Sequence, residues 1–184
     1  MKLFTSHLVI YVWFLSELAL SLWKRSRTNA TSHDNGSLGR IWLVNTVAIA
    51  LAVTAAYRVH DWYLPINRHT AFAMMWTGLI FRWYAIIHLG RFFTTNVAIA
   101  SDQHVVDTGP YRFIRHPSYT GGMITLLGLG LSLGNWASLL LVVIPCYAVL
   151  LWRIRIEEQT LLTGLGEPYR NYMQRTKRLV PFIY

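Results

Sequence analysis

The sequence predicts an all-α integral membrane protein with about five transmembrane helices, and two features favour this class over a soluble fold. The first is the distribution of apolar residues in a chain of 184 residues, 54% of them hydrophobic. Residues 118–152 form a run of 35 residues without a charged side chain. A bilayer core requires about 20 apolar residues per helix, so this run is one very long helix or two helices in a hairpin.

The predicted spans follow one another at 3–23, 41–58, 70–89, 118–133 and 136–153. The first contains a single charge, Glu17, the second contains none before Arg58 at its end, and the third contains Arg82. Gly134-Asn135-Trp136 supplies a turn between the last two, which are short, as expected of a tight helical hairpin. The chain then divides into 1–89, with the first three transmembrane helices, and 90–184, with a loop, the 118–153 hairpin and C-terminal helices.

Two further helices are expected after the hairpin. The helix over Tyr147–Leu162 should continue out of the membrane until Gly164 and Gly166 stop it, and Pro168 suits the first turn of the next helix. That next segment, GEPYRNYMQRTKRL, has the pattern of a basic amphipathic helix lying on an anionic membrane surface. Before the hairpin, residues 92–106 are expected to form a small hairpin or an extended loop.

The second feature is the asymmetry of basic residues between the two sets of loops. The formal net charge is +9, which the positive-inside rule explains without any nucleic-acid partner. One set of loops contains only Lys2, Arg58 and Arg68, and the other contains Lys24, Arg25, Arg27, Arg40, Arg91, Arg112, Arg115, Arg153, Arg155, Arg170, Arg175, Lys177 and Arg178. The N-terminus is therefore predicted outside, and the C-terminal region and the active site on the cytoplasmic side.

Several polar residues at or near the membrane are candidates for a site. Glu17 and Arg82 are ionisable groups inside predicted spans, where such groups are usually paired, so a structural ion pair is expected, with a contribution to a pocket as the alternative. Arg153 and Glu157 share a helix face. The seven histidines lack metal-ligand spacing, so no metal site is predicted.

The stretch GPYRFIRHPSYTGG, residues 109–122, is the most informative. Gly109-Pro110 forms a turn, and Pro117 prevents a helix from running through His116. His116 and Tyr119 therefore lie where the fourth span begins, and backbone N–H groups at a helix N-terminus attract carboxylates.

Residues 91–184 resemble the isoprenylcysteine carboxyl methyltransferase family and its relatives, the membrane phospholipid methyltransferases. Three ordered pieces carry the resemblance: GPYRFIRHPSYTG, then RIRIEEQTLL, then GLGEPYRNYMQRTKRLVPF. The resemblance implies a helical membrane enzyme that transfers methyl from S-adenosylmethionine, bound in a cytoplasmic pocket beside the last helices, to a lipidic acceptor within the membrane.

The resemblance also implies site residues. Arg153 and His116 are the expected catalytic residues, and Arg153 and Glu158 the expected contacts of the acceptor. The implied cofactor contacts are the strand Gln103, His104, Val105 and Val106, then Tyr111, His116, Pro117, Ser118, Tyr119 and Glu157. The family commonly has a histidine at the position of Gln103, whereas here the histidine comes one place later.

Three functions remain open from the sequence. A carboxylate acceptor is already ionised at neutral pH and needs no base, which favours O-methylation of an isoprenylcysteine-like or other lipidic acid. N-methylation of a phospholipid headgroup requires a base, for which His116 or Glu158 is the candidate. The third possibility is a non-catalytic membrane protein that retains the fold.

Overall fold

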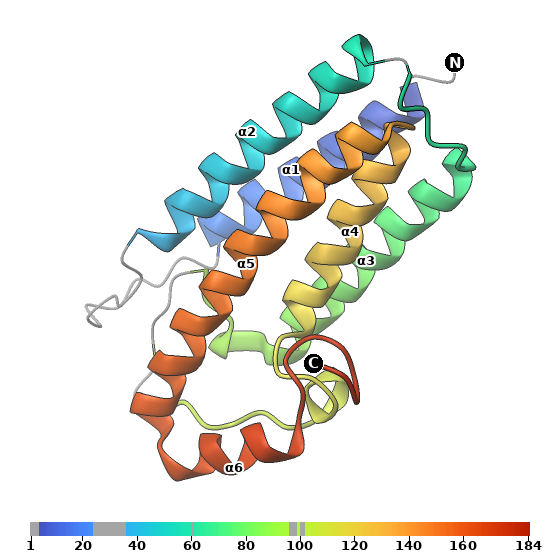
Figure 1. The fold of residues 1–184 in the computed structure, drawn as a ribbon. Helices are drawn as coiled ribbons and strands as arrows, with labels where there is room; N and C mark the ends of the chain where they lie inside the picture. The colour runs from blue at the N-terminus through green and yellow to red at the C-terminus, as the bar shows by residue number, and fades with distance from the viewer. Residues whose placement is uncertain (1–3, 24–35, 60, 96–98, 100–101) are drawn as a thin grey trace.

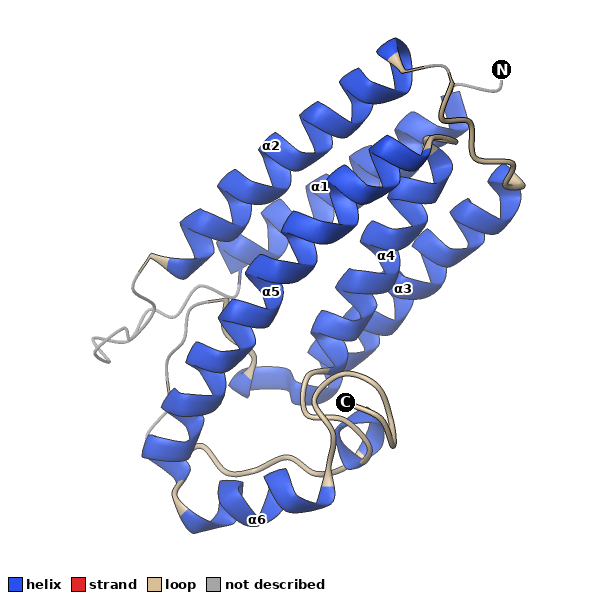
Figure 2. Ribbon diagram, in the orientation of Figure 1, coloured by secondary structure: helices blue, strands red, loops and turns tan. Residues whose placement is uncertain are grey.

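The computed structural model describes residues 4–23, 36–59, 61–95, 99 and 102–184, whose regular structure is helical (Figure 2). The predicted all-α class is confirmed. The five long helices run roughly alongside one another, and α6 crosses their lower end (Figure 1). The helices are α1 (Phe4–Trp23), α2 (Ser37–Arg58), α3 (Arg68–Leu89), α4 (Pro117–Ser132), α5 (Trp136–Leu165) and α6 (Glu167–Arg175), with short 3-10 helices η1 (Gly90–Phe92) and η2 (Gly109–Arg112).

Three described segments are long and apolar enough to cross a membrane: Ser37–Arg58, Arg68–Phe92 and Trp136–Leu165. Helix α4 has 16 residues, and the apolar part of α1 whose side chains are described is Tyr11–Leu20. The predicted second, third and fourth spans begin within a few residues of the observed helices. Helix α5 continues well past residue 153, as expected, and ends at Leu165. Gly166 caps it with a φ of +61°, whereas Gly164 remains inside the helix.

Helices α3 and α4 pack closely because glycines line their contact. A Cβ added to Gly78 would lie 2.6 Å from the Gly121 carbonyl oxygen and 2.6 Å from the backbone nitrogen of Thr125. A Cβ added to Gly128 would likewise lie 2.8 Å from the Ala71 carbonyl oxygen. The small residues thus allow the two backbones to approach as helices in membranes often do.

The predicted α4–α5 hairpin is present, and its turn is tied to the loop between α2 and α3. Gly134 has a φ of +66°, and its carbonyl accepts from the Leu64 N–H at 2.9 Å. Asn135 caps α5 by accepting from the Ser138 N–H at 3.1 Å. Farther along, the Ser138 hydroxyl donates to the Ala52 carbonyl at 2.7 Å and thereby joins α5 to α2.

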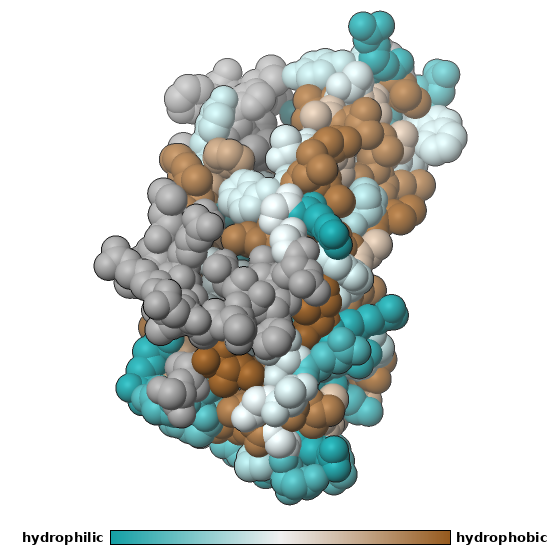
Figure 3. Space-filling model, turned by 90° about the vertical axis from the view of Figure 1, so that its left-hand side faces the viewer, coloured by the Kyte–Doolittle hydropathy of each residue, from teal (hydrophilic) through white to brown (hydrophobic). Residues whose placement is uncertain are grey.

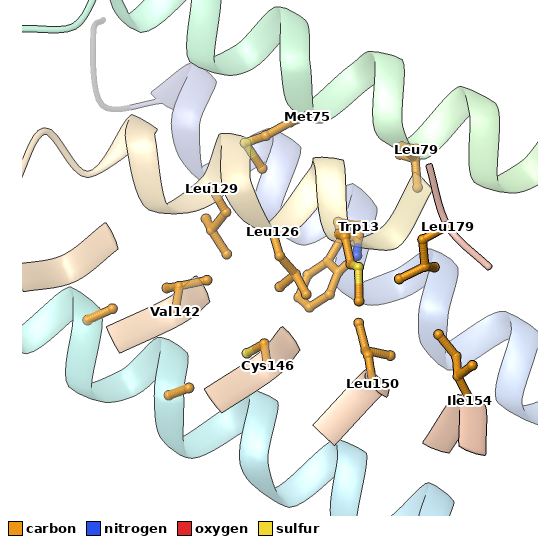
Figure 4. Packing of buried hydrophobic residues seen from close by; sticks show 13 residues of the cluster. Trp13, Met75, Leu79, Leu126, Leu129, Val142, Cys146, Leu150, Ile154 and Leu179 are labelled. Carbon is orange, nitrogen blue, oxygen red and sulfur yellow. The ribbon is translucent and has the colours of Figure 1, made fainter. Parts of the chain in front are cut away.

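The core lies between α4, α5 and their neighbours (Figure 4). Trp13, Leu126, Cys146 and Leu150 point toward one another from three helices, and Cys146 is fully buried. On the outer surface, large apolar side chains such as Leu43 and Ile87 are exposed, as expected of helices that face lipid. Figure 3 shows apolar side chains between the two ends of one face and hydrophilic ones at both ends, including the end where α6 lies.

Two sequence expectations require correction. The 103–106 segment is an irregular loop and not a strand. The described part of 92–106 contains no hairpin, which leaves the extended loop that was its alternative; residues 96–98 and 100–101 lie outside the described residues. Helix α6 is amphipathic, but its apolar side faces the protein, because Tyr169 and Tyr172 are both 3% exposed. These rings are therefore used in internal packing and not on the membrane surface.

Candidate active site

A cavity of about 500 Å³ opens among the helices on the α6 side of the bundle. One part of its wall, here called the polar wall, comes from loop 103–106, from Glu157, from Tyr169 and Tyr172 of α6, and from five residues between η2 and the first turn of α4: Tyr111, Arg115, His116, Ser118 and Tyr119. The other part, here called the apolar wall, comes from α1, α2 and α4 and includes Trp13, Phe14, Ile41, Trp42, Ile49 and Leu126. A single cavity is thus in contact with polar loops and with membrane helices.

The turn at 109–112 places the tyrosine of the polar wall. Gly109 has a φ of +54° and packs against the His88 ring, so a side chain at this position would be strained and would clash. Tyr111 follows, is buried, and donates its hydroxyl to the Ala85 carbonyl at 3.2 Å. Burial raises the pKa of Tyr111, and Glu157 raises it further, so the phenol stays neutral. Tyr111 consequently offers its ring to the cavity.

Tyr119 connects the two charged residues of the RIRIEE motif. Its hydroxyl donates to Glu157 Oε2 at 2.7 Å and accepts from Arg153 Nε at 3.4 Å. Both Tyr119 and Glu157 line the cavity. Because the hydroxyl is held from two sides, the orientation of the Tyr119 ring is fixed.

Arg153 is bound within the protein. It does not belong to the cavity wall as far as the described residues form it. It is 2% exposed, and its guanidinium donates to the Ser37 hydroxyl and, at 2.7 Å, to the Thr95 carbonyl. In this structure the Arg153 guanidinium therefore contacts other parts of the protein and does not face the cavity. Arg153 instead joins α2, loop 92–95 and Tyr119.

Glu158, the other expected acceptor contact, is buried in an ionic cluster. Its Oε1 accepts from Arg115 Nε at 2.8 Å, its Oε2 accepts from Arg178 Nε at 2.8 Å, and His116 Nε2 lies 3.4 Å from Oε1. The side chain is 5% exposed and does not belong to the described cavity wall. In this structure Glu158 thus joins three segments of the chain, and its contact with the acceptor stays a prediction.

His116 lies between the two glutamates and is the N-cap residue that precedes α4. Its Nδ1 is 3.9 Å from Glu157 Oε1, and its side chain lines the cavity. The expected free N–H groups around it are largely engaged: the His116 N–H donates to the Arg178 carbonyl at 3.0 Å, and the Tyr119 and Thr120 N–H groups donate to the His116 carbonyl. Pro117 starts the helix and, unlike Ser118, is not among the described wall residues.

All four residues of loop 103–106 line the cavity. Among them, His104 places its ring edge-to-face against Phe92, with centroids 4.9 Å apart. The structure thus brings Gln103, His104, Val105 and Val106 together with Tyr111, His116, Ser118, Tyr119 and Glu157. The described residues contain no cluster of His, Cys, Asp and Glu that could hold a metal ion.

The sequence reasoning did not identify Tyr169 as a wall residue. Tyr169 lines the cavity, and its hydroxyl is buried without a hydrogen-bond partner. Burial raises the pKa of this hydroxyl, and the carboxylates of Glu158 and Glu157 raise it further. The i, i+3 spacing of Tyr169 and Tyr172 could have indicated that both rings face the protein, since it places them on one face of a helix.

The expected pairing of Glu17 with Arg82 is confirmed. Arg82 donates from Nε to Oε1 at 2.6 Å and from Nη2 to Oε2 at 2.8 Å, and its Nη1 donates to the Ser118 carbonyl at 3.0 Å. Both side chains also line the cavity. The pair therefore joins α1 and α3 to the beginning of α4, beside the proposed site.

The fold and this cavity define a helical membrane protein whose site touches both a polar wall and an apolar wall. The profile of the "Isoprenylcysteine carboxyl methyltransferase (ICMT) family" matches residues 71–163, and the chain belongs to that family. The matched region covers most of α3, all of α4 and most of α5; it begins before the 91–184 region in which the resemblance was seen and ends before α6.

Named relatives and a solved structure agree with this assignment. Protein-S-isoprenylcysteine O-methyltransferase B of Arabidopsis thaliana is 37% identical over 117 residues, covering 60% of this chain and 57% of that protein. The Schizosaccharomyces pombe Protein-S-isoprenylcysteine O-methyltransferase is 32% identical over 125 residues, covering 67% and 53%. The structure of the eukaryotic intramembrane Ras methyltransferase ICMT is similar with a TM-score of 0.59 and 26% identity over 80% of this chain and 51% of that one.

The chain thus spans little more than half the length of these relatives. With the membrane-spanning helices described above, the similarity establishes an integral, multi-pass membrane protein.

Proposed function

We propose that this protein is an S-adenosylmethionine-dependent methyltransferase that methylates the carboxylate of an isoprenylcysteine-like lipidic acceptor. The observation that carries the proposal is the cavity with a polar and an apolar wall, in a chain that belongs to the ICMT family. A soluble cofactor and a lipid acceptor must meet in one place, and this cavity offers each of them a suitable surface.

The residues present fit the cofactor. Glu157 directs a carboxylate with 29% exposed side-chain area at the cavity, and the buried Tyr169 hydroxyl lacks a partner. Glu157 would hold the cofactor's ammonium group or ribose hydroxyls, and Tyr169 a further polar group. The cofactor, when bound, supplies an electrophilic methyl on a sulfonium. Aromatic faces attract cations, which suits Tyr111 and Tyr119.

Positioning is the main task left to the protein. Transfer from a sulfonium is an in-line displacement, so orientation and exclusion of water contribute most to the rate. Tyr119 is held by Glu157 and Arg153, and α6 covers the polar wall with Tyr169 and Tyr172. A carboxylate acceptor needs no base, so no residue of the cavity has to remove a proton from it. We assign Arg153 as a positioning residue that acts through Tyr119.

We also propose that all of α1 to α5 lie in the membrane, with the N-terminus outside and α6 on the cytoplasmic side. The acceptor tail would then reach the cavity from the bilayer along the apolar wall, and the cofactor would reach it from the cytoplasm. The basic residues at the α6 end of the bundle support this orientation.

Calorimetric titration of detergent-purified protein with S-adenosylhomocysteine tests the cofactor assignment. We expect micromolar binding that is lost in Glu157→Ala and in His116→Ala. Absence of binding by the well-folded parent protein would refute the methyltransferase proposal and leave a non-catalytic membrane protein.

Labelled S-adenosylmethionine then tests the acceptor. We expect methyl incorporation into N-acetyl-S-farnesylcysteine, as a base-labile ester, and none into phosphatidylethanolamine. The opposite result would replace O-methylation with phospholipid N-methylation, for which His116 would be the base. Arg153→Ala should reduce kcat for the carboxylate acceptor more than it reduces cofactor affinity.

A further inference from the structure

The segment that follows α6 displays large apolar side chains on a firmly built turn. Phe182 is 87% exposed and Ile183 is 77% exposed. The turn itself is held by the Leu179 and Val180 N–H groups, which both donate to the Tyr184 carbonyl at 2.7 Å. Phe182 has a φ of +66°, a left-handed conformation that is uncommon for a bulky residue. The backbone is thus fixed in a form that presents these two side chains outward.

This turn lies at the level where α4 begins. The Thr120 hydroxyl, in the first turn of α4, donates to the Leu179 carbonyl at 2.8 Å, and Leu179 is part of the core. The neighbouring strand-like contact joins Lys177 to the 113–116 segment, since the Lys177 N–H donates to the Phe113 carbonyl at 3.3 Å. Phe113 is itself 52% exposed. Phe113 and the turn are therefore both attached to the segment where α4 begins.

Exposed basic side chains lie next to Phe113. Arg112 precedes Phe113, Lys177 lies beside it, and both are exposed. Arg178 is directed to the other side of the turn, where it binds Glu158 and donates to the Tyr184 hydroxyl at 3.0 Å. Exposed aromatic and aliphatic residues next to exposed cations are the combination that an anionic membrane surface attracts.

We propose that Phe113, Phe182 and Ile183, with Arg112 and Lys177, form a membrane-interface anchor that binds anionic phospholipid headgroups of the bilayer in which the helices lie. The apolar side chains enter the boundary between headgroups and acyl chains, and the two cations contact lipid phosphates. The turn, and not α6, supplies the apolar side chains for this membrane contact, because α6 directs its own apolar face into the protein. The anchor is independent of the methyltransferase proposal, because it depends only on the membrane location of the bundle.

The anchor is connected to the polar wall of the cavity. Arg178 binds Glu158 with its side chain and accepts from the His116 N–H with its carbonyl. Lipid contact at the turn therefore stabilises the segment that carries His116. This connection gives anionic lipid a route to influence the site without entering the cavity.

Spin labels on the intact chain test the placement. Phe182→Cys and, as a matched aqueous control on α6, the exposed Gln174→Cys would be labelled in protein reconstituted into phosphatidylcholine vesicles containing phosphatidylglycerol. Cys146 is fully buried, and the unsubstituted chain controls for its labelling. We expect the label at 182 to collide more with oxygen and less with a water-soluble nickel chelate than the label at 174. Equal chelate exposure at the two positions, or a label at 182 shielded from both reagents by a second copy of the chain, would overturn the proposal.

The charge dependence is tested separately. Adding phosphatidylglycerol to phosphatidylcholine should raise the oxygen accessibility at 182 in the parent background. The double variant Arg112→Gln with Lys177→Gln should lose this response, whereas Arg170→Gln, an exposed charge on α6, should keep it. A response that persists in the double variant would contradict headgroup binding by these two cations.

Discussion

Glu157 and Glu158 are neighbours in the sequence, but the helix directs them to different surroundings. Glu157 faces the cavity and accepts from Tyr119, whereas Glu158 is enclosed by Arg115, Arg178 and His116. The first carboxylate is available to a ligand, and the second holds together three segments of the chain. Their different roles arise from the 100° rotation between consecutive helical residues.

Replacement of Glu158 by alanine should therefore affect stability. The change leaves Arg115, whose side chain is 8% exposed, without its carboxylate, and breaking a buried ion pair from one side costs about 3–5 kcal/mol. We expect a clear fall in the thermal unfolding temperature of the detergent-purified protein. Glu157→Ala is the matched control and should unfold close to the parent while losing cofactor affinity. Unfolding of Glu158→Ala at the parent temperature would show that the cluster is not structural.

A second prediction at this scale concerns the hydroxyl group of Tyr169. If its buried hydroxyl binds the cofactor, Tyr169→Phe should weaken S-adenosylhomocysteine binding by about five-fold, the equivalent of one hydrogen bond of about 1 kcal/mol. Tyr147→Phe removes a hydroxyl that donates to the Met123 carbonyl at 2.7 Å outside the cavity wall, so it should leave the Kd unchanged. Calorimetry measures both. Equal affinities of Tyr169→Phe and the parent would exclude Tyr169 as a cofactor contact.

The sequence could indicate which residue types belong to the site, but not the direction of each side chain. The 109–122 motif was identified because turn formers, aromatics and charges are unusual beside an apolar run. Glu157 was assigned to the cofactor from the family resemblance. Arg153 and Glu158 were assigned to the acceptor from the family resemblance, and helix spacing could not reveal long-range partners such as Ser37 and Arg178. Those partners lie 116 and 20 residues away in the chain, respectively.

At the scale of elements, the site depends on how closely α3 and α4 approach. Gly78 and Gly121 face each other where α3 contacts α4, and Arg82 binds the Ser118 carbonyl nearby. The sequence identified apolar helices from composition, because length and absence of charge suffice for that. It did not identify which helices would be in contact, since apolar faces of similar composition do not specify a partner.

Gly78→Ala tests this contact. The added Cβ would lie 2.6 Å from backbone atoms of α4, so the helices must separate, at a cost of about 1–3 kcal/mol for overpacking. Gly39→Ala is the control, because a Cβ at Gly39 in α2 meets nothing within 4 Å and alanine favours a helix. Thermal unfolding should therefore occur at a lower temperature for Gly78→Ala and at an unchanged or higher temperature for Gly39→Ala. Similar unfolding of the two variants would show that α3 and α4 can separate freely.

At the scale of the whole molecule, the two ends of the bundle differ in chemistry. The Leu64–Gly134 hydrogen bond places the α2–α3 loop and the α4–α5 turn at the same end. The opposite end carries η2, the ionic cluster of Glu158 and α6. Most of the described basic side chains are at this second end, whereas Arg58 and Arg68 flank the first loop. A cavity that begins at the basic end can receive a soluble cofactor only from the side of the membrane that this end faces.

The positive-inside rule then predicts that the α6 end faces the cytoplasm. Single cysteines at Asp61, in the exposed α2–α3 loop, and at Gln174, on α6, should report the two sides, because Cys146 is buried. With a membrane-impermeant maleimide applied to intact cells, we expect Asp61→Cys to react at once and Gln174→Cys only after permeabilisation. The reversed pattern would place the polar wall outside the cell, where cytoplasmic S-adenosylmethionine could not reach it. Reaction of both cysteines in intact cells would mean that α3, α4 and α5 do not separate these loops across the membrane, and the cavity could not join a cytoplasmic cofactor to a lipid acceptor.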